Sequence, residues 1–318
     1  MPNSITSVKD FTIGVSLVVF PDPGKVWGFE REFQRLYGRE PLFELAYTME
    51  RKFVKAVASL KGRTLSAHAP CPREELFPNL GSRDAEVVRK SLGTIRRSAA
   101  NAAAFGAGFL ILHPGYTTDR GVFVDYRRRL AAIGSDRDQE EQAWLWMRPG
   151  AICRPGYCAS PGYRTHLEAA VENLREASRI CRQEGVSLAV ENLNPRLTYL
   201  FQLPSELSLL AGQIPGLSLC LDVGHLWISS LVHGFGFTAG LAEILATGRV
   251  ATAHLHDNSS SLGPQPHLAD EHALIGSGKV PLREALRLLG EAGVGNLIIE
   301  SLAPPAENFA GLLRLLQD

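Results

Sequence analysis

The sequence repeats one pattern: a short apolar run that ends in a histidine, an aspartate or a glutamate. The clearest cases are residues 219–225 (LCLDVGH) and 253–257 (AHLHD). Apolar runs of four to eight residues bounded by turn residues are typical of buried strands. Polar side chains at the carboxyl ends of such strands are typical of a functional site on one rim of a barrel. The pattern therefore predicts a sheet whose strand ends gather metal ligands.

Eight apolar runs, six of which end in such a residue, alternate with helical segments along the 318 residues. The strands are expected at residues 11–20, 41–47, 64–68, 109–113, 186–191, 217–222, 250–256 and 296–300. This alternation implies right-handed parallel crossovers and an α/β fold, most simply a (β/α)8 TIM barrel. Barrels of this length form one domain, so 1–318 is expected to be a single domain. Because the second run is the least regular, an open sheet of six or seven strands is the alternative.

A long insertion, residues 116–165, interrupts the alternation after the fourth strand. It contains Trp144, Trp146 and three consecutive arginines at 127–129, and helical periodicity resumes only at His166. A long segment of this kind within a compact domain is usually functional or disordered. A lid over the site and a solvated insertion with a small helix fit it equally well. The three arginines themselves are expected to form a solvated face rather than an anion clamp.

Six of the expected strands end in potential metal ligands. These are His68, His113, Glu191, Asp222, His254 and Glu300. The last four come from consecutive strands and would line one arc of the rim. Oxygen and nitrogen ligands without thiolate suit Mn²⁺, Zn²⁺, Co²⁺ or Mg²⁺. Each residue alone could be an ordinary turn residue, but charged groups buried together cost several kcal/mol unless they are paired or bound to metal. The joint pattern therefore predicts a metal site.

Other polar side chains near these strand ends are candidates for a second ion or for substrate contacts. With two of the strand-end histidines they form the set His68, His113, His225, His256, Asp270 and His272. His254 and His256 are two residues apart, so on a regular strand both would point the same way. Residues 275–279 (IGSGK) precede a helix and could offer backbone N–H groups to a phosphate. A simple helix-entry turn is the alternative there.

Composition restricts the class of protein. There are 33 basic and 33 acidic side chains, and this balance argues against a nonspecific polyanion binder, although a local basic patch stays open. Five cysteines at irregular spacing indicate reduced thiols rather than a disulfide framework. No signal sequence or apolar run of membrane-spanning length is present. We therefore expect a soluble cytoplasmic protein that does not contact membranes and is not primarily a nucleic-acid binder.

Seven segments, in order, resemble the xylose-isomerase-like TIM-barrel superfamily, in particular the sugar phosphate isomerase/epimerase group related to endonuclease IV. The segments are SAHAP (66–70), LILHPG (110–115), LAVENL (188–193), LCLDVGH (219–225), AHLHDN (253–258), DEHALIGSGKV (270–280) and LIIES (297–301). They cover the chain from about residue 60 onward. Single segments are weak signals, but seven in family order are specific.

The resemblance implies a set of metal ligands. The isomerase/epimerase pattern implies core ligation by Glu191, Asp222, His254 and Glu300. Endonuclease IV proteins use a larger set around three zinc ions, and its positions match His68, His113, Glu191, Asp222, His225, His254, Asp270, His272 and Glu300. One to three ions per chain are therefore compatible with the resemblance.

Two departures weigh against DNA repair. Residues 254–258 read HLHDN where endonuclease IV proteins usually have HLNDS, and residues 191–195 read ENLNP where they usually have ENTAG. The insertion at 116–165 fits neither group, so the specificity is expected to differ from both.

The leading hypothesis is a divalent-metal-dependent isomerase or epimerase of a small sugar, sugar phosphate or polyol. Glu191 and Glu300 would face each other across the rim and transfer a proton through a metal-stabilised enediolate. The alternative is a zinc-dependent phosphoesterase like endonuclease IV, and a third option is a non-catalytic barrel that binds a ligand or partner. The sequence leaves the substrate and the oligomeric state open, with a homo-oligomer as one option.

Overall fold

A computed structural model describes residues 11–134, 143–147 and 150–317, and its centre is a closed barrel of eight parallel strands. Around the barrel the strands are β1 (Thr12–Ser16), β2 (Leu42–Leu45), β3 (Thr64–His68), β5 (Phe109–Leu112), β9 (Ser187–Glu191), β10 (Ser218–Asp222), β11 (Val250–Leu255) and β12 (Asn296–Ile299). Strand β12 pairs in parallel with β1 and closes the ring. The predicted (β/α)8 barrel is confirmed, and the open-sheet alternative is wrong.

The least regular predicted strand is present as β2, between β1 and β3. The first strand is shorter than predicted. After Ser16 the chain turns into a 3₁₀ segment, Leu17–Val19, although the sequence there is as apolar and β-branched as the strand itself. Propensity alone therefore did not reveal where β1 ends.

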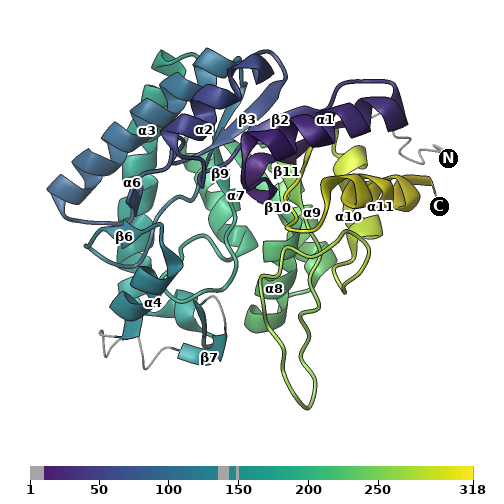
Figure 1. The fold of residues 1–318 in the computed structure, drawn as a ribbon. Coiled ribbons are helices and arrows are strands. Elements are labelled where there is room, and N and C mark those ends of the chain that lie inside the picture. The colour runs from purple at the N-terminus through teal and green to yellow at the C-terminus, as the bar shows by residue number, and fades with distance from the viewer. Residues whose placement is uncertain (1–10, 135–142, 148–149, 318) are drawn as a thin grey trace.

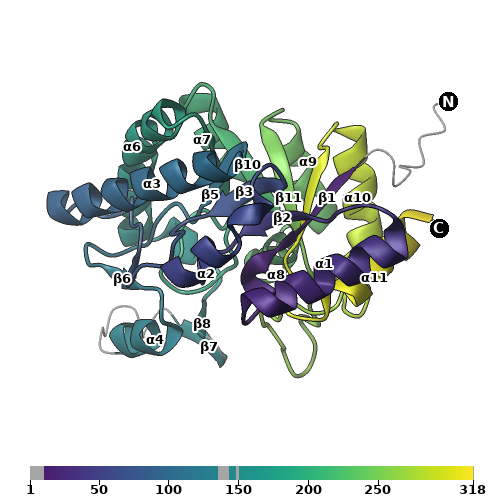
Figure 2. The same ribbon diagram turned by 45° about the horizontal axis from the view of Figure 1, so that its top comes forward.

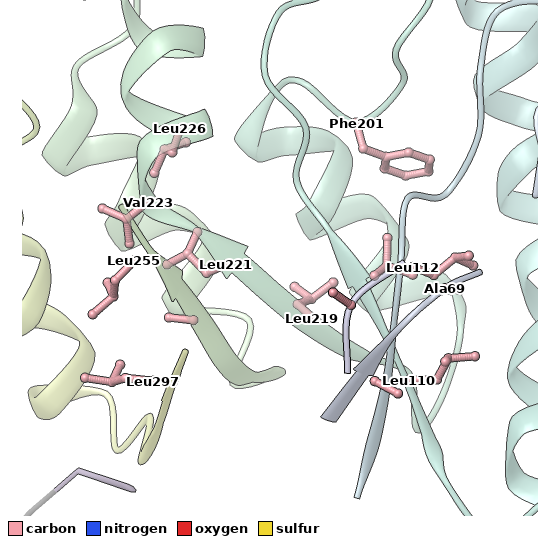
Figure 3. Close-up of a cluster of buried hydrophobic side chains, with 14 of the residues drawn as sticks. Ala69, Leu110, Leu112, Phe201, Leu219, Leu221, Val223, Leu226, Leu255 and Leu297 are labelled. Carbon is pink, nitrogen blue, oxygen red and sulfur yellow. The ribbon is translucent and has the colours of Figure 1, made fainter. Parts of the chain in front are cut away.

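Along each strand, successive side chains point alternately into the barrel and outward toward the helices. On β10, Leu219 and Leu221 pack in the main hydrophobic core, whereas Cys220 packs in a separate small cluster with Ile111 and Ala189. Figure 3 shows Leu221 near Leu255 of the next strand, with Leu219 drawn on the side of Leu110 and Leu112. Each fully buried leucine contributes about 1.5–3 kcal/mol. The alternate face of the same strands carries the polar residues of the site.

Nine helices of the described residues surround the barrel or its rim outside the insertion (Figures 1 and 2). They are α1 (Pro23–Tyr37), α2 (Arg51–Ala56), α3 (Ala85–Phe105), α6 (Pro161–Gln183), α7 (Pro204–Gln213), α8 (Val223–His233), α9 (Phe237–Leu245), α10 (Leu282–Glu291) and α11 (Pro305–Gln317). Helix α1 illustrates why they form where they do. Asp22 caps its first turn, Pro23 fits the first helical position, and Gly38 ends it at a φ of 66°.

Helix α8 was not predicted from the sequence. The sequence is compatible with Asp222 as an ordinary turn residue after its strand, whereas in the structure Asp222 is the N-cap of a helix that contains His225. The Asp222 Oδ1 atom caps α8 by accepting a hydrogen bond from the His225 N–H at 2.6 Å. Most of α8 is buried, including residues on several sides of the helix, so its sequence lacks the polar stripe that reveals a surface helix.

The insertion is built from short elements attached to the rest of the fold. Strand β6 (Val122–Phe123) pairs with β4 (Leu76–Phe77), and helix α4 (Tyr126–Gly134) follows. A hairpin of β7 (Ala143–Met147) and β8 (Gly150–Cys153) comes next. Helix α6 begins at Pro161, earlier than the predicted His166, because Ser160 caps it. In Figures 1 and 2, α4 and β7 lie at one end of the barrel.

All five cysteines are buried and free, as expected for reduced thiols. Among the described residues, none of the helices combines the length and apolar character needed to cross a bilayer.

Candidate metal centre

The structure brings all ten predicted site residues together at the carboxyl ends of the barrel strands. They form three groups, within each of which the ligand atoms lie within 4.8 Å of one another. The groups are His68, His113 and Glu191; Glu191, Asp222, His254 and Glu300; and His225, His256, Asp270 and His272. Residues from β3 to the end of β12 thus meet in space, as the barrel topology requires.

Glu191 at the end of β9 connects the groups. Its Oε2 atom lies 3.1 Å from His68 Nε2 and 3.5 Å from His113 Nε2. Its Oε1 atom lies 3.3 Å from His225 Nδ1 and 3.8 Å from His254 Nδ1. The carboxylate is 1% exposed, so water does not solvate it appreciably. Glu191 would therefore be able to hold a cation together with His68 and His113 or together with His254.

Three histidines are oriented by backbone carbonyls. The Nδ1 atom of His68 lies 3.0 Å from Ala69 O, that of His225 lies 3.1 Å from Asn192 O, and that of His272 lies 2.6 Å from Glu300 O. A carbonyl oxygen only accepts hydrogen bonds, so each Nδ1 must carry the proton. In the neutral ring the Nε2 lone pair is then left for a metal, which is the arrangement that metal-binding histidines generally show.

Glu44 on β2 orients His254 and was missed from the sequence. Its fully buried Oε2 atom accepts hydrogen bonds from Ser66 Oγ at 2.7 Å and from His254 Nε2 at 3.1 Å. The His254 Nδ1 atom is thereby turned toward Glu300 Oε2, 3.1 Å away. A glutamate within the apolar run LFEL was a usable signal, because a charge on a buried strand needs a partner.

Several buried atoms in the groups form no hydrogen bond in the described structure, although the last two lie at ion-pair distance from Glu300 and His272: Asp222 Oδ2, His254 Nδ1 and Asp270 Oδ1. An unsatisfied buried acceptor costs about 1–3 kcal/mol. All three atoms belong to residues of the groups, and each can donate an electron pair to a cation. Mixed carboxylate and imidazole donors suit Zn²⁺, Mn²⁺, Co²⁺ or Mg²⁺. The residues present therefore fit divalent ions.

Opposite charges in the groups shift the pKa values of their members. Burial raises the pKa of the Glu191 carboxyl, but the histidines around it, led by His113, outweigh this and hold the pKa well below its usual range. Burial likewise opposes ionisation of Glu300, yet His254 and His272 lower its pKa to about 2. Burial lowers the pKa of His272, but the Asp270 carboxylate raises it to about 9. Without metal, the raised pKa values of His254 and His272 keep these two rings protonated beside the carboxylates at neutral pH.

His254 and His256 serve different groups although they are close in sequence. Strand β11 ends at Leu255, so His256 already lies beyond the regular strand. Its Nε2 atom is 3.1 Å from Asp222 Oδ1 and 3.8 Å from Asp270 Oδ1. The rings of His256 and His272 stack with centroids 4.0 Å apart. His256 thus links the second and third groups.

The loop at residues 275–279 is not available to a phosphate. The N–H groups of Gly276, Gly278 and Val280 donate to the Asp257 carboxylate at 3.1, 2.8 and 3.1 Å. Of the two alternatives for this segment, the structure therefore supports the turn that leads into α10. Asp257 satisfies the N–H groups that a phosphate would have needed.

A small cavity of about 60 Å³ opens onto the groups. Besides six of the candidate ligands, it is lined by Tyr47, Phe77, Arg129, Asn194, Arg196 and Tyr199. These six residues were not recognised as site residues from the sequence. The prediction for the arginines at 127–129 holds for Arg127 and Arg128, which are exposed, but not for Arg129.

A comparison of the sequence with models of known protein families matches one family of TIM barrels. A sequence model described as "Xylose isomerase-like TIM barrel" matches residues 28–318. The uncharacterized protein MJ1614 of Methanocaldococcus jannaschii is 25% identical over 158 residues, which cover 49% of this chain and 56% of that protein.

Three solved structures have the same fold. A D-tagatose 3-epimerase-like protein is 20% identical with a TM-score of 0.67, covering 96% of this chain and 97% of its own. D-psicose 3-epimerase with D-tagatose from Clostridium cellulolyticum is 12% identical with a TM-score of 0.62, covering 96% and 97%. The TTHB071 protein of Thermus thermophilus, soaked with ZnCl2, is 18% identical with a TM-score of 0.57, covering 95% and 97%. At these identities the likeness establishes the fold alone.

Proposed function

Because the chain belongs to the xylose isomerase-like TIM-barrel family, we propose that it is a divalent-metal-dependent isomerase or epimerase. Its substrate would be a small sugar, sugar phosphate or polyol. The observation that carries the proposal is that Glu191 and Glu300 converge, with Asp222 and His254, on one candidate cation group beside a small cavity. Similarity of fold to sugar 3-epimerases supports the same class of reaction.

The mechanism assigns the two glutamates to proton transfer. Glu300 lines the cavity, and its contact with His254 runs through Oε2, so Oε1 is placed to take a proton from a substrate carbon. The low pKa of Glu300 keeps its carboxylate ionised at neutral pH. In this mechanism Glu191, three strands away around the barrel, donates its own proton to another atom or face from its protonated form, and both glutamates exchange protons with solvent before the next turnover. A bound divalent ion would polarise the substrate carbonyl as a Lewis acid.

The small cavity favours a small substrate. A volume of about 60 Å³ admits the reacting end of a sugar beside the ligand groups. Most residues of the three candidate cation groups are buried. His68, Asp222, His254 and His256 are almost inaccessible to solvent. Exclusion of water strengthens the electrostatic interactions of a developing negative charge with its surroundings.

The test is deuterium exchange. Metal-loaded protein is incubated in D₂O with a panel of ketoses, ketose phosphates and polyols, and mass spectrometry locates any label on carbon. We expect one substrate to take up deuterium, and Glu300→Gln to lose the exchange. Glu271→Gln is the matched control, because Glu271 bonds Ser259 on the same rim outside the three groups. No uptake into any panel member by fully metal-loaded protein would refute the proposal.

A zinc-dependent phosphoesterase is the second candidate, and one observation favours it. The Oε2 atom of Glu191 faces His68 and His113, and its Oε1 atom faces His254 of another group, so with two or three ions bound neither oxygen would be free to carry a proton. Clustered ions in such a site activate water and hold a phosphate. Two or more tightly bound ions per chain together with cleavage of phosphate esters would select this candidate. One ion per chain with deuterium exchange would select the isomerase.

A further inference from the structure

Two arginines reach the cavity from separate parts of the chain. Arg196 lies in the loop after β9, and Arg129 lies on α4, within the insertion. The remaining lining residues are aromatic side chains, Asn194 and members of the cation groups. The insertion therefore contributes a positive charge directly to the candidate substrate site.

Arg196 is held by the third cation group. Its Nη2 atom lies 3.1 Å from Asp270 Oδ2, and its guanidinium carbon is 5.9 Å from the centre of the Tyr199 ring. Asn194 also donates to Asp270 Oδ2, at 2.9 Å. Because Asp270 is both a candidate ligand and the partner of Arg196, a cation bound there would draw the carboxylate charge away from the arginine.

Arg129 has no comparable partner. Its guanidinium carbon lies 5.4 Å from the centre of the Phe77 ring, and Nη1 donates to Phe123 O at 3.1 Å. Within the described ranges, no carboxylate lies at ion-pair distance from it. A guanidinium has five N–H donors, and this contact uses one of them. Most of the hydrogen-bonding capacity of Arg129 is thus left for something that enters the cavity.

The neighbours of Arg129 explain its position. Arg128 pairs with Glu75 at 2.7 Å, and Arg127 contacts the exposed Tyr126 ring. The Val124 N–H donates to Glu75 O at 2.9 Å, and β6 pairs with β4 just before α4 begins. These contacts attach the start of α4 to the segment after β3. Arg129 is therefore held against Phe77, whose ring lies 5.5 Å from that of His113.

We propose that the substrate carries an anionic group, a phosphate ester or a carboxylate, which Arg129 and Arg196 bind together while the rest of the molecule reaches the cation groups. This inference rests on the proposed isomerase or epimerase and narrows its substrate class. A planar guanidinium group donates two parallel hydrogen bonds to two oxygens of one phosphate or carboxylate group. A neutral sugar would leave the positive charge of Arg129 without a counterion.

The experiment compares three five-carbon probes on metal-loaded protein by calorimetry: D-ribulose, D-ribulose 5-phosphate and D-ribonate. We expect at least one anionic probe to bind about tenfold more tightly than D-ribulose, and Arg129→Met to weaken that binding about 10- to 100-fold. Arg127→Met is the matched control, because it removes the same charge from an exposed position on the same helix and should change binding less than twofold. The phosphorylated and carboxylated probes distinguish the two anionic groups.

The inference is overturned if the neutral and anionic probes bind alike, or if the Arg127 and Arg129 variants weaken binding equally. Deuterium exchange separates this failure from failure of the proposed function. Exchange into neutral sugars with no preference for anions would overturn only the inference. Tight, Arg129-dependent anion binding without deuterium exchange into any member of the full substrate panel would uphold the anion site and refute the isomerase.

Discussion

Glu44 offers a sharp test of how the barrel prepares a metal ligand. It lies on the inner face of β2, fully buried, and contacts no candidate cation group except through His254. If His254 binds a cation through Nδ1, the Glu44 carboxylate fixes the orientation of the ring and raises its basicity. Replacing Glu44 should therefore weaken metal binding although Glu44 is not itself a ligand.

The expected magnitude follows from the two hydrogen bonds to Glu44 Oε2, from Ser66 at 2.7 Å and from His254 at 3.1 Å. Loss of such an outer partner costs about 10- to 100-fold in metal affinity, or about 1.4–2.7 kcal/mol. Glu44→Gln keeps an acceptor oxygen but removes the charge, so about tenfold is expected. Glu44→Leu leaves both donors unsatisfied and should also destabilise the fold by about 1–3 kcal/mol for each.

The assay titrates metal-free protein with Co²⁺ in competition with a chelator and follows the ligand-field spectrum. Ser66→Ala is the control, because it removes one hydrogen bond to Glu44 and leaves both the charge and His254 in place. We expect Ser66→Ala to stay within about threefold of the parent. An unchanged Co²⁺ affinity and spectrum in Glu44→Gln would refute the orienting role of Glu44.

Two further predictions concern stability and packing. Burial raises the pKa of Glu206 to about 7, so the folded protein holds a proton there that the unfolded chain releases above about 4.5. Stability should fall by up to about 3 kcal/mol between pH 4.5 and 7. Glu206→Gln should melt higher than the parent at pH 8 and equally at pH 4.5, and equal melting at both would contradict this. A Cβ at Gly224 would collide with the His256 ring. Gly224→Ala should therefore cost about 1–3 kcal/mol in chemical denaturation, whereas Gly212→Ala, with open space around it, should not destabilise.

The sequence was sufficient to predict the barrel and the set of candidate ligands because each barrel strand is an apolar run with a defined end. Parallel strands joined by helices must place those ends on one rim, so Glu191 and Glu300 could be expected to meet without coordinates. The same reasoning placed His254 in the second group. It left the position of His256 open, because the side-chain direction beyond Leu255 depends on how the strand ends.

Three features of the structure are not evident from the sequence, because they depend on tertiary contacts or on a helix that is buried on several sides. Helix α8 is buried on several sides, so it lacks an amphipathic pattern. Arg129 resembles its two arginine neighbours in sequence, and only the packing of α4 against Phe77 distinguishes it. The N–H groups around Gly278 looked available to an anion because the sequence does not show that Asp257 accepts from them.

The most direct measurement is anomalous diffraction from crystals of protein loaded with Zn²⁺ or Mn²⁺, together with metal analysis in solution. The account predicts an ion shared by Glu191, Asp222, His254 and Glu300, at about 2.0–2.2 Å from their ligand atoms. Fully loaded crystals in which no ion touches these four side chains would contradict it.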